Sequence, residues 1–355
     1  MLMVIFGAGA SYDSSPTYTI GMVPPGYEHD QANEFHRPPL AKDLFANRPL
    51  FIEALERFPQ CKTIVPKLRS RAVLSGQISI ETVLSEIQEQ ATTYPRAMRE
   101  LAAVRCYLCD AISQCEGNWK KITKGITNYL SLLRELERFH TSENPVCLVT
   151  FNYDTLLEHA LERLGYAINS MEDYVDRVGP FKVFKLHGSL NWGQTVEVPI
   201  PKNVQGDWSA LISHMIENAP RLQFKDRFVL GNSLLGSETE LVFPAIAIPV
   251  QTKREFQCPA RVIEVLHSML PRVTKILVVG WRATEGHLLK LLQRNIKRPV
   301  EIGIVAGGAE YAKEVQAQLH RALVGCFLQC TPHDGGFTDF ISGTDLQTFV
   351  ASDPL

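Results

Sequence analysis

Leu2–Phe6 (LMVIF) near the N-terminus is followed at once by Gly7–Ser11 (GAGAS). Five consecutive apolar residues are typical of a strand that is buried on both faces of a parallel sheet. Gly7 permits a tight turn after that strand, and Gly9 places no Cβ between the backbone and a bound phosphate. In a Rossmann-like sheet, a strand that runs into a Gly-x-Gly turn lies close to the pyrophosphate of a dinucleotide. We therefore expect dinucleotide binding at this turn.

The same stretch lacks two features that a dehydrogenase requires. The third glycine of GxGxxG would fall at position 12, which is Tyr12. About twenty residues further on, an acidic residue would bind the ribose of the cofactor. The chain has Pro24–Glu28 (PPGYE) there, and this composition indicates a loop. The sequence therefore favours dinucleotide binding without hydride transfer.

The composition is that of an ordinary globular protein. Of the 355 residues, 45% are hydrophobic and 21% are charged, and the net charge is −2. No global basic field would recruit nucleic acid or an anionic membrane, so we expect neither as a direct partner. No apolar run approaches the roughly 18 residues of a membrane span, and the apolar start lacks the basic region of a signal peptide. Eight scattered cysteines suit reduced thiols, and we expect a cytoplasmic protein.

From residue 146 onward, predicted strands alternate with helices. This pattern predicts an α/β fold with a Rossmann-like parallel sheet and helices on both faces. After the first strand, the expected strands are 146–151, 182–186, 241–243, 276–280, 300–305 and 326–329. Residues 191–240 give a mixed signal of loop and helix.

Two segments precede that alternating region. Apolar residues recur at helical spacing in 97–115 and again in 119–139, which predicts two helices. We interpret 40–140 as an inserted helical subdomain of a single dinucleotide-binding domain that spans 1–355. Residues 12–40 are rich in Pro, Gly, Ser, Tyr and Asp, which indicates a long loop. Such a loop is either an active-site lid or a surface insertion.

Polar side chains follow several of the predicted strands. Ligands of parallel α/β sheets bind at the carboxyl ends of the strands, so these side chains are candidates for a shared site. Asn152 and Asp154 stand between a strand and a helix, where the simpler interpretation is a helix N-cap. His187 follows the next strand, beside a glycine and a serine. A histidine is structural more often than it is catalytic, and the sequence around His187 leaves both interpretations open.

Four strand-end segments together resemble the sirtuin-like superfamily. Gly7–Ser11 matches its Gly-Ala-Gly-x-Ser signature, and Thr150–Asp154 (TFNYD) looks like its Thr-Gln-Asn-Ile-Asp motif. His187–Ser189 is similar to its catalytic His-Gly segment. Val279–Trp281 falls where the family has a Gly-Thr/Tyr-Ser step near the adenosine ribose. The order and spacing agree over most of the chain.

The resemblance implies NAD⁺ bound at the sheet edge and chemistry at its nicotinamide–ribose bond. It implies that Asn152 orients a water or the ribose hydroxyls, and that His187 accepts a proton from one of them. Asp154 would bind the nicotinamide carboxamide or only cap a helix. Ser11 and the amides of Ala8–Ser11 would bind phosphate. The binding residues that the resemblance implies are Gly7, Ala8, Gly9, Ala10, Ser11, Asp154, Gly188, Ser189, Gly280 and Trp281.

The chain departs from protein-deacylating sirtuins in its cysteines. Those enzymes carry two Cys-x-x-Cys pairs after the catalytic histidine, which hold a structural zinc. Beyond His187 this chain has only Cys258, Cys326 and Cys330. The pair Cys106-x-x-Cys109 lies inside a predicted helix, and zinc requires four ligands, so we interpret both as core thiols. We expect no metal.

Two further features favour one branch of the superfamily. The Phe-Gly-Glu segment with which deacylases pair their acyl-lysine peptide is missing, and the block 40–140 is larger than the usual insertion. The chain looks like the bacterial sirtuin-like effectors of antiphage defence, which are NAD⁺ hydrolases and have a Pro-Pro-Leu stretch similar to Pro38–Leu40. The expected products are nicotinamide and ADP-ribose, with depletion of cellular NAD⁺ as the outcome.

Two alternatives remain open at this stage: an NAD-dependent protein deacylase and a non-catalytic sensor of NAD or ADP-ribose. The resemblance also implies a homo-oligomer and a partner such as a HerA-type ring ATPase. Because an unrestrained NAD⁺ hydrolase would kill its own cell, we expect a gate. The 12–40 loop and the helical block are the candidates for it.

Overall fold

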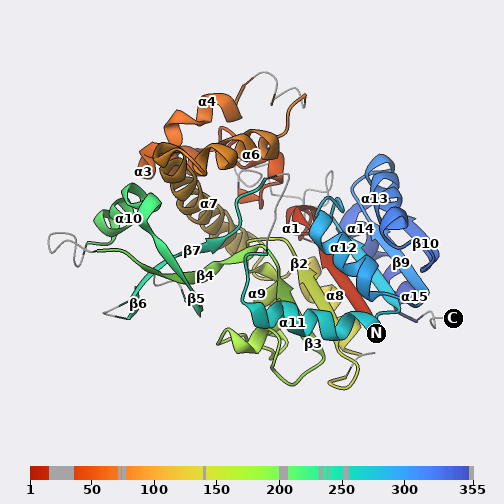
Figure 1. The fold of residues 1–355 in the computed structure, drawn as a ribbon. Helices are drawn as coiled ribbons and strands as arrows, with labels where there is room; N and C mark the ends of the chain where they lie inside the picture. The colour runs from red at the N-terminus through yellow and green to blue at the C-terminus, as the bar shows by residue number, and fades with distance from the viewer. Residues whose placement is uncertain are drawn as a thin grey trace. The chain divides into compact units, whose positions relative to one another are not determined.

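The computed structural model describes residues 1–15, 36–70, 73, 77–138, 141–199, 207–231, 235–237, 240–250 and 256–351. The chain divides into two compact units, whose elements Figure 1 labels. The first unit comprises Met1–Pro38, Glu116–His187 and Arg254–Leu355, and the second comprises Pro39–Cys115 and Gly188–Lys253. Most of the expected loop 12–40, namely 16–35, lies outside the described residues. The domain and lid boundaries expected from the sequence stay predictions.

The first unit is built on a six-stranded sheet with the order β10-β9-β8-β1-β2-β3. All five neighbouring pairs are parallel, and in the register Val4 of β1 lies opposite Leu148 of β2 and Leu277 of β8. Every residue of β1, β2 and β8 is buried, as the apolar runs predict. The strands are β1 (Leu2–Phe6), β2 (Val146–Thr150), β3 (Phe181–Lys185), β8 (Lys275–Val279), β9 (Val300–Val305) and β10 (Phe327–His333).

Helices flank this sheet on both sides. Helix α8 contacts α9, α14 and α15, whereas α12 contacts α13 (Figure 1). The predicted fold class, a Rossmann-like parallel sheet covered by helices, is therefore confirmed. The helices of this unit are α1 (Ala8–Tyr12), α8 (Asn128–Glu137), α9 (Leu156–Arg163), α11 (Ala260–Met269), α12 (Gly286–Asn295), α13 (Ala309–Ala322), α14 (Gly336–Ser342) and α15 (Asp345–Ala351), with short 3-10 helices at Glu172–Tyr174 and Leu270–Arg272.

The strand order reverses between β1 and β8. From β1 the chain adds β2 and β3 on one side, and then adds β8, β9 and β10 on the other side. In open parallel sheets such a reversal is the topological switch point, where ligands bind beyond the carboxyl ends of the strands. The Gly7–Ser11 stretch and the Gly280–Trp281 step follow the two strands that border this point.

The second unit contains a four-stranded antiparallel sheet that the sequence did not predict. Its order is β5-β4-β7-β6. The expected mixture of loop and helix for 191–240 is therefore wrong where strands are present, whereas helix α10 and a 3-10 helix do occur in this range. The elements of this unit are β4 (Gly188–Glu197), α10 (Trp208–Glu217), β5 (Gln223–Leu230), β6 (Leu235–Ser237), β7 (Glu240–Ile246), α3 (Pro49–Arg57), α4 (Val65–Leu68) and α6 (Ile80–Ala91), with 3-10 helices at Ala41–Asp43, Pro59–Thr63 and Ala219–Arg221.

Strand β7 continues through Pro244, where the sequence suggested that a short strand ends. Pro244 lies opposite Gly193 of β4. On the other side of β7, the pairing with β6 extends to Leu241 among the residues that the structure describes. Proline is tolerated at an edge because its missing N–H is not required there. The strand is therefore longer than the sequence indicates.

Helix α7 (Pro95–Ile122) is also longer than predicted, because it continues through Gly117 and Trp119. The helix ends at Lys124 and Gly125, which both have positive φ angles, of 50° and 68°. Thr127 then caps α8 by accepting a hydrogen bond from the Leu130 amide. The expected helix 119–139 is thus the end of α7 together with α8. None of the helices in the described part of the chain is long and apolar enough to span a membrane.

Candidate active site

Three glycines bring the ends of β1 and β8 into close contact at the switch point. The Gly7 amide donates to the Val279 carbonyl at 3.0 Å, and the Gly9 amide donates to the Gly280 carbonyl at 3.1 Å. A Cβ on Gly7 would lie 2.5 Å from the Gly280 oxygen, and one on Gly9 would lie 2.8 Å from the Gly280 Cα. Gly280 itself has a φ of +60°. The close approach of two backbones therefore requires glycine at all three positions.

The structure gives these glycines a different physical role from the one that the sequence suggested. The sequence suggested an open loop whose amides cradle a phosphate, whereas β1 runs directly into α1 after Gly7. The amides of Gly7, Gly9 and Ala10 all donate to backbone carbonyl groups. Ala8 and Gly9 are the partly exposed residues of the stretch. Phosphate binding by this stretch stays a prediction.

Asn152 lies just beyond the end of β2, and its side chain reaches the turn after β1. Its Nδ2 donates to the Gly7 carbonyl and to Ser11 Oγ, both at 2.9 Å, and lies 3.1 Å from the Tyr129 hydroxyl. The residue is 8% exposed. Its Oδ1 accepts no hydrogen bond from a described residue and is not a fully buried atom without a partner. That oxygen is therefore the part of Asn152 that a bound molecule can reach.

His187 follows β3 and belongs to a row of aromatic rings. Its ring centroid lies 4.6 Å from that of Phe151 and 6.0 Å from that of His287 on α12. Phe151 is stacked on Trp281, with centroids 5.5 Å apart and an interplanar angle of 16°. His187 is 2% exposed. The row connects the ends of β2, β3 and β8, so the predicted site residues after these strands share one edge of the sheet.

Asp154 is a buried carboxyl group with a perturbed pKa. Burial, together with the negative charge of Glu116, raises the pKa of this group from 3.8 to about 6. The positive charge of Lys185 and hydrogen bonds from Ser11 and the Leu156 amide oppose that rise. The Leu156 amide donates to Asp154 Oδ1 at 3.2 Å at the start of α9. Asp154 thus accepts from the first amide of α9, although the N-cap residue of that helix is Thr155.

Lys185 and Glu158 form a buried ion pair beneath this residue. Lys185 is fully buried, and its Nζ lies 2.9 Å from Glu158 Oε1 and 2.5 Å from the Asp154 carbonyl. Tyr174 donates its hydroxyl to the same Glu158 oxygen at 3.1 Å. Removal of one partner of a buried pair leaves an uncompensated charge. The pair therefore fixes the backbone that carries Asp154.

Glu116 holds the other side of the β2–α9 connection. Its Oε2 accepts from the Thr155 amide at 2.7 Å, and its Oε1 accepts from the Thr155 hydroxyl at 2.6 Å. Lys120, one turn along α7, donates to Glu116 Oε1 at 2.5 Å. A carboxylate at a helix N-terminus is favoured because the free amides and the helix dipole attract negative charge. Glu116 thus performs part of the capping of α9.

Two predicted binding residues lie in the second unit. Gly188 and Ser189 begin β4, and both are buried. Gly188 has a φ of +77°, and a Cβ there would lie 1.8 Å from the Ala245 carbonyl oxygen of β7. Sheet pairing accordingly accounts for glycine at this position. A binding role for Gly188 and Ser189 stays a prediction.

Three residues of the site were not predicted from the sequence: Tyr129, Lys185 and Glu116. Tyr129 belongs to the apolar stripe that predicted its helix, so its hydroxyl carried no signal of its own. A lysine inside an apolar strand is uncommon, and Lys185 therefore offered a signal two residues before His187. Glu116 gave no signal in the sequence, because an acidic residue on a long helix is ordinarily exposed to water.

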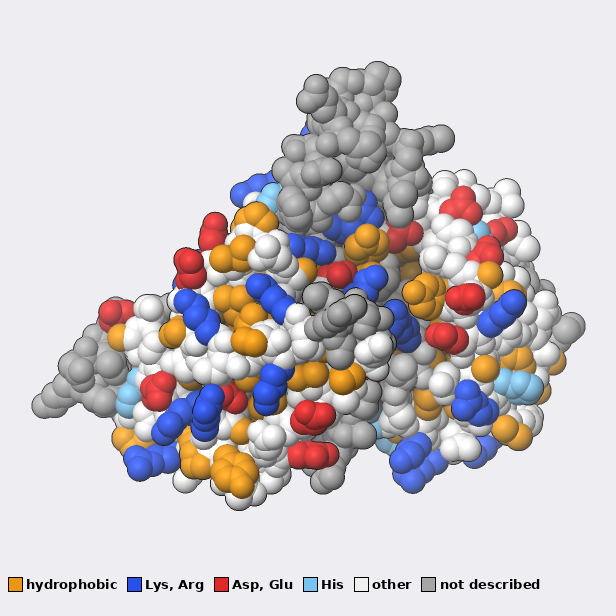
Figure 2. All heavy atoms as spheres, turned by 90° about the horizontal axis from the view of Figure 1, so that it is seen from above, with side chains coloured by type: hydrophobic (Ala, Val, Ile, Leu, Met, Phe, Trp, Pro, Cys, Tyr) orange, Lys and Arg blue, Asp and Glu red, His pale blue; other side chains and the backbone are white. Residues whose placement is uncertain are grey.

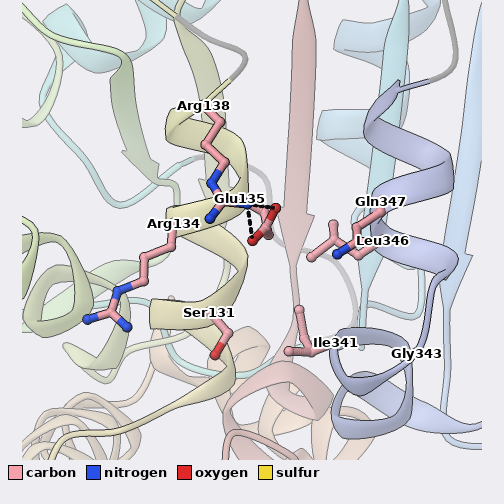
Figure 3. A pocket seen from close by; sticks show the side chains of 8 residues that line it. All are labelled: Ser131, Arg134, Glu135, Arg138, Ile341, Gly343, Leu346 and Gln347. Carbon is pink, nitrogen blue, oxygen red and sulfur yellow. Dashed lines mark hydrogen bonds and ion pairs between the residues drawn. The ribbon is translucent and has the colours of Figure 1, made fainter.

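Figure 3 shows a cavity of about 350 Å³ in the first unit that contains none of the predicted site residues. It lies between α8 and the end of α14 together with the start of α15. Glu135 and Arg138 line it and form an ion pair at 3.0 Å, so these two charges compensate each other. On the face that Figure 2 displays, Lys and Arg side chains are interspersed with Asp and Glu. Among the described residues no group of three His, Cys, Asp or Glu is placed to hold a metal ion.

Comparison with known proteins gives one family match and one structural likeness of note. No curated protein matches the chain significantly. Among solved structures, a match is Sir2 in complex with the inhibitor EX-527, 2'-O-acetyl-ADP-ribose and a deacetylated p53 peptide. It is 12% identical to this chain, and the match covers 99% of this chain and 95% of that chain. Its TM-score of 0.38 is too low to support any statement about activity.

The family match falls on the segment that carries the candidate site. The model of the SIR2-like domain matches residues 146–204. This range contains β2, α9, β3 and the strand β4, and with them Asn152, Asp154 and His187. The segment that supplies the polar strand ends of this site is therefore similar to a SIR2-like domain, which supports the resemblance at the level of the sirtuin-like superfamily.

Proposed function

We propose that this protein is an NAD⁺ hydrolase that cleaves the bond between nicotinamide and ribose. The observation that carries the proposal is the position of Asn152 and His187. They follow two adjacent strands beside the switch point, within the segment similar to a SIR2-like domain. Asn152 is also hydrogen-bonded to the turn after β1. NAD-related chemistry at this edge would account for these two polar side chains at the ends of neighbouring strands.

The reaction needs few chemical groups. The oxygen of a water molecule forms a bond to C1' of the ribose, and the bond from C1' to the nicotinamide nitrogen breaks. Its electron pair stays on the ring nitrogen, so nicotinamide leaves as a neutral molecule. The water loses one proton, and ADP-ribose is the second product. Catalysis consists of holding the ribose, orienting the water and accepting that proton.

The described residues can supply these roles. The Oδ1 of Asn152 is an acceptor that can orient the water or a ribose hydroxyl. A neutral His187 imidazole can accept the proton. The aromatic row of Phe151, Trp281 and His187 would shield the developing positive charge on the ribose from bulk water.

We extend the proposal to a biological role on the basis of the resemblance. The enzyme would act in antiphage defence by depleting NAD⁺, as a homo-oligomer with a HerA-type ring ATPase as partner. Infection of cells that carry the chain, compared with cells that carry His187→Ala, should lower cellular NAD⁺ only in the first case. Equal NAD⁺ levels in both would refute this role.

The substrate requirement tests the proposed chemistry. Purified protein is incubated with NAD⁺, with and without an acyl-lysine peptide, and nicotinamide and ADP-ribose are measured by chromatography. A hydrolase releases both without peptide, and at an unchanged rate with it. Nicotinamide release that depends on the peptide would identify a deacylase instead, and tight binding of NAD⁺ without product would identify a sensor.

A further inference from the structure

Tyr129 places a buried hydroxyl group next to Asn152. Its ring, on α8, packs against Phe6 of β1 and Phe337 of α14, with centroid distances of 5.1 and 5.8 Å. The residue is 1% exposed. Its hydroxyl lies 2.9 Å from Ser11 Oγ and 3.1 Å from Asn152 Nδ2. Two aromatic neighbours thus hold the ring, and the hydroxyl completes a triangle with Ser11 and Asn152.

The Gly7 carbonyl and the triangle together determine which way the Asn152 carboxamide faces. The Gly7 carbonyl, 2.9 Å from Nδ2, can only accept a hydrogen bond, so the NH₂ end of the carboxamide must face it. This contact uses one of the two Nδ2 hydrogens. The second is shared between Ser11 Oγ at 2.9 Å and the Tyr129 hydroxyl at 3.1 Å. Both hydrogens therefore have protein acceptors, and Oδ1 is left for a bound molecule.

The hydroxyl protons of Tyr129 and Ser11 can continue the chain of donation in a single direction. The Tyr129 hydroxyl accepts from Asn152, so it can donate its own proton to Ser11 Oγ. Ser11 in turn can donate to the Asp154 carboxyl group, whose pKa it lowers. Donation then runs from Asn152 through Tyr129 and Ser11 to Asp154. Without the tyrosine hydroxyl, Asn152 loses an acceptor and Ser11 loses a donor.

We propose that Tyr129 is a positioning residue of the hydrolase site, because its hydroxyl locks the Asn152 carboxamide with Oδ1 directed to the reacting water or ribose hydroxyl. The inference rests on the proposed function and adds to it a residue outside the SIR2-like segment. Tyr129 acts through Asn152 and does not itself contact the substrate. Its loss should therefore affect the reaction step more than the binding of NAD⁺.

The test is Tyr129→Phe, which keeps the ring contacts with Phe6 and Phe337 and removes only the hydroxyl. Misplacement of a catalytic group can cost up to about a hundredfold in rate. We expect kcat for nicotinamide release to fall about tenfold to a hundredfold, with the KM for NAD⁺ within about threefold of wild type. The matched control is Tyr107→Phe in the second unit. Tyr107 is also fully buried, and its hydroxyl donates to the Leu44 carbonyl at 2.7 Å.

The control separates a positioning role from a general loss of packing. Tyr129→Phe loses its hydrogen bonds with Ser11 and Asn152, and Tyr107→Phe loses the one with Leu44, so the thermal unfolding midpoints of both variants should fall. Only Tyr129→Phe should lose kcat. An unchanged kcat in a folded Tyr129→Phe protein, or an equal loss of kcat in both variants, would overturn the inference and leave the proposed function standing.

A second variant serves if Tyr129→Phe does not fold. Ser11→Ala removes another corner of the triangle, and kcat measured at saturating NAD⁺ is insensitive to any loss of binding at Ser11. That kcat should fall by a similar factor, whereas an unchanged value would overturn the inference. A wild-type protein that releases no nicotinamide overturns the proposed function, and this inference with it.

Discussion

The substitution Asp154→Asn should stabilise the protein at neutral pH and leave its stability in acid nearly unchanged. Asp154 is 7% exposed, and burial together with Glu116 raises the pKa of its carboxyl group from 3.8 to about 6. The folded state therefore binds this proton more tightly than the unfolded state. The stability that results is fully present below about pH 4 and is lost as the pH rises through about 6.

The size of the effect follows from the difference between the pKa values of Asp154 in the folded and unfolded states. At about 1.4 kcal/mol for each pH unit between the two pKa values, ionisation of Asp154 removes about 3 kcal/mol of stability by pH 7. Asparagine does not titrate, and its Oδ1 can still accept from the Leu156 amide as Asp154 does at 3.2 Å. The free energy of unfolding of the variant minus that of wild type should therefore rise by up to about 3 kcal/mol from pH 4 to pH 7.

Urea denaturation followed by tryptophan fluorescence at several pH values measures this difference. Asp176→Asn is the control, because Asp176 is paired with Arg261 at 2.7 Å and the hydrogen bond from Arg261 lowers the pKa of its carboxyl group. Its contribution to stability is lost as the pH falls, so the control should show the opposite sign or no change. A stability difference for Asp154→Asn that is independent of pH, or that falls toward neutral pH, would refute the reasoning.

Three further changes test other parts of the structure. Gly280→Ala places a Cβ 2.3 Å from the Ala10 amide nitrogen at a φ of +60°, and it should destabilise the protein by about 3 kcal/mol or more in thermal unfolding. By contrast, Gly117→Ala in α7, where a Cβ meets nothing within 4 Å, should stabilise the protein by about 0.5–1 kcal/mol. Equal effects of Gly280→Ala and Gly117→Ala on stability would contradict the close packing of the switch point. Lys185→Met leaves Glu158 without its buried partner and should cost about 3–5 kcal/mol in urea denaturation. Because the Lys185 charge lowers the pKa of Asp154, a carboxyl NMR titration of the variant should show that pKa raised further, and a lowered value would argue against the pairing.

Much of the first unit could be predicted from the sequence because its strands are buried on both faces. Continuous apolar runs such as Leu2–Phe6 and Ile276–Val279 leave few alternatives to a central parallel strand. The second sheet gave no such signal. Strand β5 (Gln223–Leu230) is exposed along most of its length, so its composition resembles a loop. The extent of α7 was missed because Gly117 looks like a break, whereas the positive φ angles occur at Lys124 and Gly125.

The candidate site, too, could be predicted from the sequence only in part. Asn152, Asp154 and His187 could be selected because they stand directly after buried strands, and topology then places strand ends on one edge. Their surroundings depend on residues that are distant in the sequence. Tyr129 reaches Asn152 across 23 positions, and its hydroxyl lies on a helix stripe that looks entirely apolar. The role of Gly9 could not be predicted either, because the backbone it approaches belongs to Gly280.

The central claim is that Asn152 and His187 catalyse the release of nicotinamide from NAD⁺. The most direct test measures nicotinamide and ADP-ribose formed from NAD⁺ alone by wild type, Asn152→Ala, His187→Ala and the control His159→Ala. His159 lies on α9 in the same segment, at the surface, where it pairs with Glu162 at 3.5 Å. The account predicts equal amounts of both products from wild type and His159→Ala, and none from the other two variants. Full activity in His187→Ala or Asn152→Ala, or no products from wild type as an oligomer or with its partner, would contradict it.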